Sequence, residues 1–420
     1  MDGVWTPRRA LWSGPGKSVD GVVGDTPGRT AATALTSEDG GAHGVEGKLY
    51  GPGDDPAGQQ PPSDGEHVES QHPGTDPVAA LRRIAFLLER RLADSYRIKA
   101  YRGAAATLLG LPPAEVRSRA AAGTLRELPG IGAKTAAVAE DCVAGRVPAY
   151  LTELERTAGP LVAGGDQHRA ALRGDLHSHS DWSDGGSPIE EMAMTAAELG
   201  HEYLVLTDHS PRLTVANGLS VERLREQLEV VAAVDEHLGD GFRLLRGIEV
   251  DILDDGSLDQ TEEMLGRLDV VVASVHSKLK MDTAAMTRRM VAAVRHPRTN
   301  VLGHCTGRLV RGGRGTRAQS SFDAEAVFTA CAEHDVAVEI NSRPERCDPP
   351  DELVELALGL GCLFSIDSDA HAPGQLDFVQ YGAERAQRLG VPLDRIVTSW
   401  PVDRVLEWAA GRGPAGESRG

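Results

Sequence analysis

Seven short β-rich segments alternate with helical segments over residues 174–410, and this alternation restricts the chain to an α/β fold with parallel strands. Helical stretches such as 189–200, 220–239 and 351–361 separate them. Seven strand–helix units favour a closed β/α barrel, and an open doubly wound sheet is the structural alternative. The segments read GDLHSH, YLVLTDH, FRLLRGIEVDI, VVVASVH, NVLGHC, VAVEIN and CLFSIDSDAH.

Side chains that can bind a metal stand at or just beyond the end of every predicted strand. Because strand ends converge on one face of a β/α barrel, these groups are expected to meet there. Residues two apart on a strand point to the same side, so the pair in HSH can hold one ion together. The candidates in chain order are His177, His179, Asp184, His209, Glu249, His276, His304, Glu339 with Asn341, Asp369 and His371.

Each candidate has a plainer reading when it is taken alone. A histidine at a strand end is more often a hydrogen-bonded core or surface residue, Glu249 could be a salt-bridged carboxylate, and Asp184 a turn residue before Gly185. Their coincidence at one point of successive units favours metal binding. Imidazoles and carboxylates suit Zn, Mn or Fe, and their number predicts two or three divalent ions, with Glu249 as the bridging carboxylate. Such clusters hydrolyse phosphate esters.

The segments outside the barrel differ from it in composition and charge. Residues 1–75 are rich in Gly, Pro, Ser, Thr and Asp and are expected to form a disordered tail, as are residues 411–420. Residues 76–156 show helical periodicity, with four helices expected, and carry 13 Lys/Arg against 9 Asp/Glu in a chain whose net charge is −18. A linker at 157–173 precedes the barrel domain at 174–410.

Cysteine usage and hydropathy indicate a cytoplasmic protein. The five cysteines are scattered without CxxC spacing, which fits free thiols better than disulfides or a thiolate zinc site. We expect no membrane partner, because no apolar run approaches the roughly 20 residues that span a bilayer. We also see no signal peptide pattern at the N-terminus.

The strand-end motifs, in order, resemble the PHP (polymerase and histidinol phosphatase) family: DLHSHSDWSDG, LTDHS, GIEVDI, SVHS, GHCTGR, VEINSRPERCD and SDAH. The resemblance covers about residues 174–410 and implies a distorted seven-stranded β/α barrel with a trinuclear metal site. It implies one ion held by His177, His179, Glu249 and Asp369, a second by Glu249, His276 and His304, and a third by Asp184, His209 and His371. It also implies catalytic roles for Glu249, His371 and Asp184.

The helices at 76–156 resemble the opening domain of family X DNA polymerases, in YRIKAYRGAA and ELPGIGAKTAAVAEDCVAG. LPGIGAK is similar to a helix-hairpin-helix hairpin, whose backbone N–H groups contact a DNA phosphate without reading sequence. A glycine-containing helix connection that touches nothing is the plainer reading. The DNA contacts expected are Gly130, Gly132, Lys134, Arg97 and Arg102.

Two departures from family X polymerases limit the activities expected. Their bacterial members place a nucleotidyltransferase domain before the PHP barrel, where this chain has only the linker 157–173, so we expect no polymerase activity. Relatives with lyase activity carry a Schiff-base lysine one turn after the hairpin lysine. Here that position is Val138, which argues against lyase chemistry.

Three functions fit these features. The first is a DNA-directed phosphoesterase that trims 3′ ends, with the basic helices holding the strand; the second is a small-molecule phosphatase of the histidinol-phosphate type. The third is a non-catalytic DNA-binding protein with structural metals. Arg308, Asn341 and Arg346 are expected to bind substrate. Arg311, Arg314 and Arg343 are further candidates, and solubilising surface arginines are the alternative for the first two.

Overall fold

The computed structural model describes residues 75–313 and 315–411. These residues fall within one compact unit, Pro73–Gly420. The predicted tails, apart from Thr75 and Gly411, lie outside the described residues, and so does Arg314.

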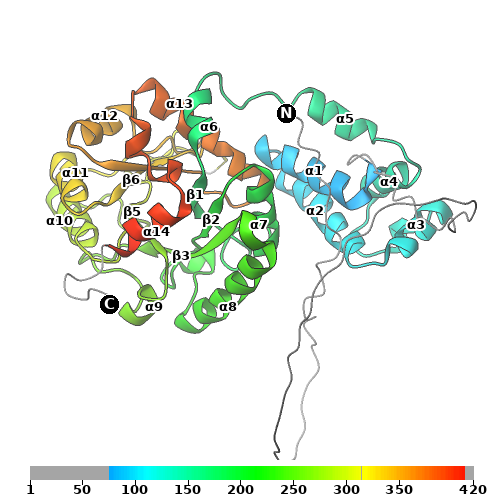
Figure 1. The fold of residues 1–420 in the computed structure, drawn as a ribbon, viewed down its shortest axis with the longest axis horizontal. Helices are drawn as coiled ribbons and strands as arrows, with labels where there is room; N and C mark the ends of the chain where they lie inside the picture. Colours follow the sequence, from blue (N-terminus) through cyan, green and yellow to red (C-terminus); the bar gives the residue numbers. More distant parts are fainter. Residues whose placement is uncertain (1–74, 314, 412–420) are drawn as a thin grey trace, which may run out of the picture. The chain divides into compact units, whose positions relative to one another are not determined.

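Seven parallel strands form the barrel in the order β1-β2-β3-β4-β5-β6-β7, so that each strand pairs with the next one along the chain (Figure 1). A parallel bridge between Ser178, the last residue of the first strand, and Ala370, just beyond the last strand, nearly closes the sheet. The predicted seven-stranded β/α barrel is therefore confirmed. The strands are β1 (Gly174–Ser178), β2 (Tyr203–Leu206), β3 (Arg243–Asp251), β4 (Val270–Ser274), β5 (Val301–Leu302), β6 (Ala337–Asn341) and β7 (Leu363–Asp367).

Helices follow the strands and cover the outside of the barrel (Figure 1). Several begin at a side chain that caps the free N–H groups of the first turn: Ser220 before α8, Asp282 before α10 and Asp323 before α11. The barrel helices are α7 (Ile189–Glu198), α8 (Val221–Leu238), α9 (Glu262–Leu265), α10 (Thr283–Val294), α11 (Ala324–Glu333), α12 (Asp351–Gly359), α13 (Val379–Arg388) and α14 (Val402–Ala410). Short 3₁₀ turns join them; one of these, η5 (Pro373–Phe378), follows β7.

The strands are buried on both faces because helices cover the outside and side chains fill the inside. Leu176, Val205, Val272 and Val301 share one apolar cluster. Every residue of β1, β4 and β6 is buried, including the polar ones toward the strand ends. Buried charge is costly unless it is paired or bound to a metal, so the strand ends are the part of the barrel that demands a functional explanation.

The N-terminal helices form a second core around Leu81, Ile84, Leu108 and Leu125. The four predicted helices are present, and two more were not foreseen: α5 closes this domain and α6 lies in the segment read as a linker. The positive φ of 78° at Gly130 shapes the hairpin before α4. The helices are α1 (Pro77–Arg90), α2 (Ser95–Leu109), α3 (Pro113–Ala122), α4 (Ala133–Val143), α5 (Ala149–Arg156) and α6 (Asp166–Ala171).

Candidate metal centre

Glu249, near the end of β3, lies at the centre of the clustered side chains. Its Oε1 is 2.9 Å from His304 Nε2 and 3.3 Å from His276 Nε2. Its Oε2 is 2.9 Å from His209 Nδ1 and 3.3 Å from His177 Nε2. Glu249 is 1% exposed. A carboxylate whose two oxygens face different sets of imidazoles has the arrangement required to bridge cations.

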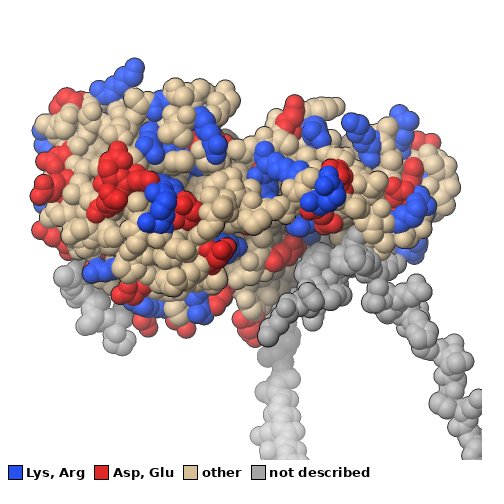
Figure 2. Space-filling model, turned by 90° about the horizontal axis from the view of Figure 1, so that it is seen from above, with Lys and Arg blue, Asp and Glu red and all other residues tan. Residues whose placement is uncertain are grey.

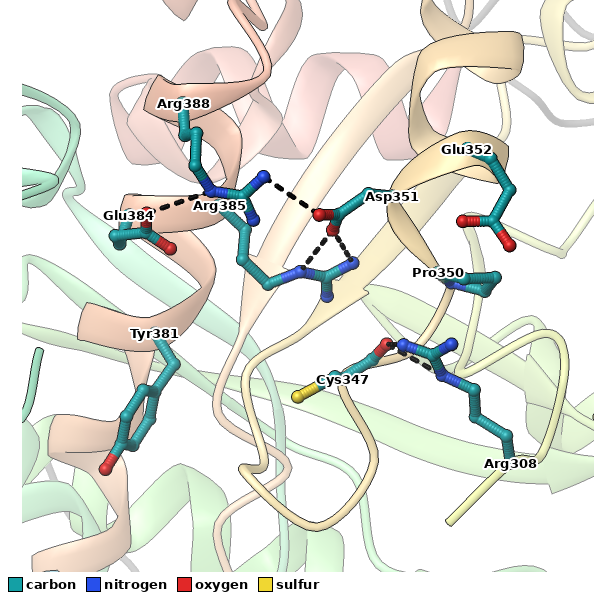
Figure 3. Close-up of a pocket in the computed structure, with 9 residues that line it drawn as sticks. All are labelled: Arg308, Cys347, Pro350, Asp351, Glu352, Tyr381, Glu384, Arg385 and Arg388. Carbon is teal, nitrogen blue, oxygen red and sulfur yellow. Dashed lines mark hydrogen bonds and ion pairs between the residues drawn. The ribbon is translucent and has the colours of Figure 1, made fainter. Parts of the chain in front are cut away.

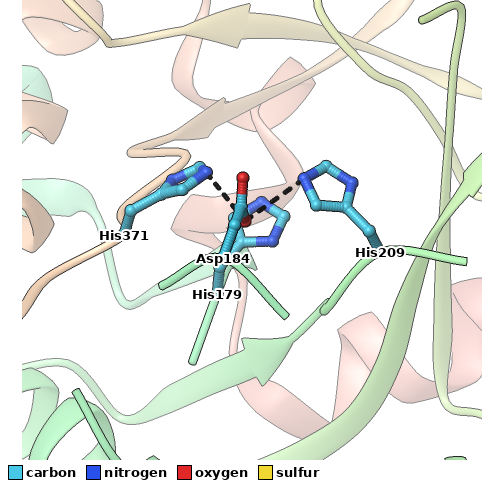
Figure 4. A group of neighbouring side chains, drawn as sticks. All are labelled: His179, Asp184, His209 and His371. Atoms are coloured by element: carbon cyan, nitrogen blue, oxygen red, sulfur yellow. Dashed lines mark ion pairs between the residues drawn. The ribbon is translucent and has the colours of Figure 1, made fainter. Parts of the chain in front are cut away.

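A second group surrounds Asp184, which lies in the turn after β1 (Figure 4). Its Oδ1 is 3.3 Å from His371 Nε2 and 3.5 Å from His209 Nε2. His179 lies beside them, with its ring stacked 4.5 Å from that of His209. Three segments distant in the sequence therefore converge here, as their common position after strand ends predicts.

Three ligand groups result, each with its donor atoms within 4.8 Å of one another: His177, His179 and Glu249; His209, Glu249 and His276; and His179, Asp184, His209 and His371. They differ from the sets implied by family resemblance, because His179 and His209 each belong to two groups. His304 remains close to Glu249, and Asp369 Oδ1 is 3.5 Å from His179 Nε2. All nine predicted metal ligands are thus brought together.

Unpartnered polar atoms show that this donor set fits a metal. His177 Nε2, both ring nitrogens of His179 and of His276, and both carboxylate oxygens of Glu249 are buried without a hydrogen-bond partner. Buried polar groups are normally satisfied, because an unmet hydrogen bond costs about 1–3 kcal/mol. Imidazole nitrogens and carboxylate oxygens aimed at common points are satisfied by divalent cations.

The electrostatics of the cluster also require positive charge beside Glu249. Burial alone would raise the pKa of Glu249, but the surrounding imidazoles outweigh it and hold the pKa well below its usual value. Burial lowers the pKa of His276, yet Glu249 and Asp251 outweigh burial and raise it to about 9. Burial and neighbouring imidazoles lower the pKa of His179 to about 3. Divalent cations would replace the protons that Glu249 draws onto its neighbours.

Carboxylates behind the histidines fix their orientation. Glu339 Oε1 is 2.6 Å from His177 Nδ1, and its other oxygen accepts a hydrogen bond from the His304 backbone. Asp251 accepts a hydrogen bond from the backbone N–H of His276 at 3.0 Å, and the same oxygen lies 3.6 Å from the ring Nδ1. The Glu339 contact leaves the opposite ring nitrogen of His177 free for a metal. Asp251 is the residue that sequence reasoning missed, although its position two residues after Glu249 on the same strand was a usable signal.

The predicted substrate residues lie at different distances from the cluster. Arg346 Nε is 3.2 Å from Asp369 Oδ2, and Asn341 donates a hydrogen bond to the same oxygen at 3.1 Å. Arg343 donates to the Asp369 carbonyl at 2.9 Å. Arg311 instead donates to the Pro344 carbonyl. Arg346 and Asn341 therefore border the metal centre.

Arg308 faces away from the cluster. Its guanidinium donates to the Arg346 and Cys347 carbonyls, and it lines a pocket of about 420 Å³ beside Arg385 (Figure 3). None of the residues that line this pocket is a candidate metal ligand. The backbone carbonyls hold Arg308 in the barrel wall, which does not suit the predicted role of clamping substrate at the metals.

The predicted DNA contacts differ in their exposure to solvent. Gly130, Gly132 and Lys134 are exposed at the hairpin and first turn of α4, and Arg97 is exposed on α2. Arg102 is only 12% exposed and is paired with Glu89 and Glu191. Because its guanidinium is already paired with these carboxylates, Arg102 has no accessible pair of N–H groups for a phosphate. It makes an internal contact and is not part of a DNA-binding face.

Comparison with known proteins agrees with this architecture. Residues 72–146 match a helix-hairpin-helix domain model, and residues 175–343 match the PHP domain model. The chain is 36% identical over 217 residues to the DNA polymerase/3′-5′ exonuclease PolX of Bacillus subtilis, covering 52% of this chain and 37% of PolX. It thus spans well under half of that relative.

Shorter relatives are matched nearly end to end. A "probable phosphatase" of Thermoanaerobacter sp. is 26% identical over 249 residues, covering 56% of this chain and 93% of that protein. A solved histidinol phosphate phosphatase of Lactococcus lactis, complexed with Zn, L-histidinol and phosphate, aligns with a TM-score of 0.40 at 19% identity, covering 52% and 92% of the two chains. The two domain models and the matching sequences show that the chain carries a PHP domain preceded by a helix-hairpin-helix domain, and that it is homologous to PolX and to bacterial probable phosphatases.

Proposed function

We propose that this protein is a metal-dependent phosphoric ester hydrolase that acts on DNA 3′ ends, with the helix-hairpin-helix domain binding the DNA. The observation that carries the hydrolase proposal is the convergence of nine candidate ligands around Glu249 and Asp184, where ring nitrogens of His177, His179, His209 and His276 and both oxygens of Glu249 are buried without a hydrogen-bond partner. Similarity to PolX, whose name includes a 3′-5′ exonuclease, supports DNA as the substrate.

Two or three divalent ions, Zn, Mn or Fe, would be held by these residues, where they would lower the pKa of bound water toward 7 and neutralise phosphoryl oxygens. Glu249 holds the imidazoles at fixed separations, and Glu339 orients His177. Arg346, at the border of the cluster, can neutralise a further phosphate oxygen through terminal nitrogens that make no hydrogen bond within the described residues. Glu249, Asp184 and His371 are the residues we place closest to the reacting phosphate.

We place the DNA contact of the helical domain at the hairpin before α4. Lys134 and the exposed glycines of the hairpin stand at the start of α4, where backbone N–H groups and the helix dipole attract a phosphate. On the face of the molecule in Figure 2, acidic and basic side chains are interspersed in small groups. Such a contact positions a strand without reading its sequence.

A small-molecule phosphatase is the second candidate. It is favoured by the nearly full-length match to probable phosphatases and by the acidic barrel, because negative charge repels a long polyanion. A cytoplasmic location accompanies both proposals: the described cysteines form no disulfide with one another, and no helix in the described part of the chain has the length and apolar character to cross a membrane.

One assay separates the candidates. The purified full chain, loaded with Mn or Zn, is given labelled single-stranded DNA and, separately, histidinol phosphate. Shortening of the DNA from its 3′ end supports the first proposal. Cleavage of histidinol phosphate with the DNA untouched would select the second, and E249Q controls for contaminating nucleases in both arms.

A further inference from the structure

A buried carboxylate of the helical domain holds the backbone of the barrel domain. Glu89, on α1, is 1% exposed, and its Oε2 accepts a hydrogen bond from the Gly374 N–H at 2.8 Å. Arg102, on α2, donates to both carboxylate oxygens, at 2.8 and 2.7 Å. Arg102 therefore pairs with the Glu89 carboxylate within the helical domain, and the same carboxylate also binds a backbone donor of η5.

The packing around this contact admits no side chain. A Cβ on Gly374 would lie 2.2 Å from the Phe86 carbonyl oxygen and 2.7 Å from Glu89 Cβ. Next to it, Arg90 pairs with Asp377, and both side chains are about 10% exposed. The docking of α1 on η5 is therefore close and desolvated, unlike the exposed pairs of a loosely tethered domain.

The barrel segment η5, which α1 holds in this way, directly follows the candidate metal ligand His371. His371 lies three residues before Gly374, and its N–H donates to the Gln375 side chain at 2.9 Å. The His371 carbonyl accepts a hydrogen bond from the Gly186 N–H at 2.7 Å. A short chain of contacts therefore runs from Glu89 through η5 to His371, whose Nε2 is 3.3 Å from Asp184.

We propose that Glu89 is a positioning residue of the metal centre, and that the helical domain supports the His371 turn as well as offering a surface for DNA. It follows that metal retention depends on α1. Turnover of a substrate too small to reach the helices also depends on α1. Only this second consequence rests on the proposed hydrolase function.

The metal arm of the test uses full-length variants. E89Q keeps the shape of the side chain but removes the charge that orders Arg102 and the Gly374 N–H, and G374A forces α1 away from η5. The matched controls are E155Q, which breaks the exposed Arg83 pair, and G103A, where a Cβ meets nothing within 4 Å. Zinc remaining after dialysis against graded EDTA is measured together with the melting temperature.

We expect E89Q and G374A to release part of their zinc at EDTA concentrations about tenfold lower than the controls require, in line with the effect of residues that orient metal ligands. A folded E89Q that keeps its zinc like E155Q would overturn the proposal. If G374A fails to fold, E89Q decides the question.

The activity arm uses p-nitrophenyl phosphate, which is too small to bridge to the helices. Positioning predicts a lower kcat for E89Q at nearly unchanged KM. An effect confined to KM for DNA would show that Glu89 serves only DNA binding. If the wild-type protein hydrolyses no ester, the hydrolase proposal fails, and the zinc measurement still tests the role of Glu89.

Discussion

Glu339 Oε1 lies 2.6 Å from His177 Nδ1, and this contact fixes which nitrogen of His177 faces Glu249. Both residues are fully buried, at 0% exposure. Because Glu339 accepts the Nδ1 proton, Nε2 keeps its lone pair for a cation. The orientation of one candidate metal ligand thus depends on a carboxylate of β6, which β7 separates from β1 in the nearly closed barrel.

E339Q should therefore weaken metal binding about 10- to 100-fold, because an amide holds the His177 tautomer less firmly than a carboxylate does. Competition with a chelating dye measures the affinity. E333Q, an exposed glutamate at the end of α11, serves as the control. Equal affinities in the two variants would contradict the assigned role of Glu339.

Removal of metal should lower the melting temperature of the wild-type protein. A ligand that binds only the folded state, present at 100 times its Kd, adds about 2.7 kcal/mol to the free energy of unfolding.

E249Q removes the carboxylate common to two ligand groups and should lose more than one ion per chain, with activity at least about a hundredfold lower. Elemental analysis measures the ions bound per chain, and calorimetry with and without EDTA measures the melting temperature of the wild type and of E249Q. An E249Q protein that melts like the metal-loaded wild type would refute the role of Glu249 in metal binding.

His201 should make the protein less stable in acid. Burial, followed by the charge of Arg169, lowers its pKa to about 3, and both ring nitrogens lack a hydrogen-bond partner. Between the ordinary pKa of about 6.5 and a pH near 3, the unfolded state binds the extra proton. The free energy of unfolding therefore falls as the pH drops through this window, by at most about 1.4 kcal/mol per unit from this residue.

The replacement of His201 by leucine should flatten this dependence. Urea unfolding of the wild type and H201L between pH 7 and pH 4 measures the difference. Parallel curves for the two proteins would mean that His201 does not titrate on unfolding.

Lys134 should contribute one phosphate contact if the hairpin binds DNA. K134A is expected to reduce the slope of log affinity against log salt by about 0.7 on single strands, with little change in melting temperature, because the side chain is exposed. R156Q, on the exposed face of α5, is the control. An unchanged slope in K134A would place the DNA contact elsewhere. Deletion of residues 76–156 is a poorer test, since α1 packs on the barrel.

The sequence by itself determined the barrel and the candidate metal ligands at its strand ends. Alternation of strand and helix sets parallel pairing, and the HSH spacing at His177 places two imidazoles on one side of a strand. These are local periodicities, and the regular geometry of strands and helices fixes the side on which each side chain of such a pattern lies. The strand ends then had to meet, because the fold closes.

Only the tertiary structure decided the partners of the long charged side chains. The sequence predicts Arg102 as a DNA contact and Arg308 as a substrate contact, yet in the structure Arg102 pairs with Glu89 and Arg308 binds backbone carbonyls in the barrel wall. The sequence does not distinguish an arginine that faces solvent from one that pairs with a buried acid. The environment of the side chain is set by packing between segments hundreds of residues apart, such as α1 and η5, and no local pattern predicts that packing.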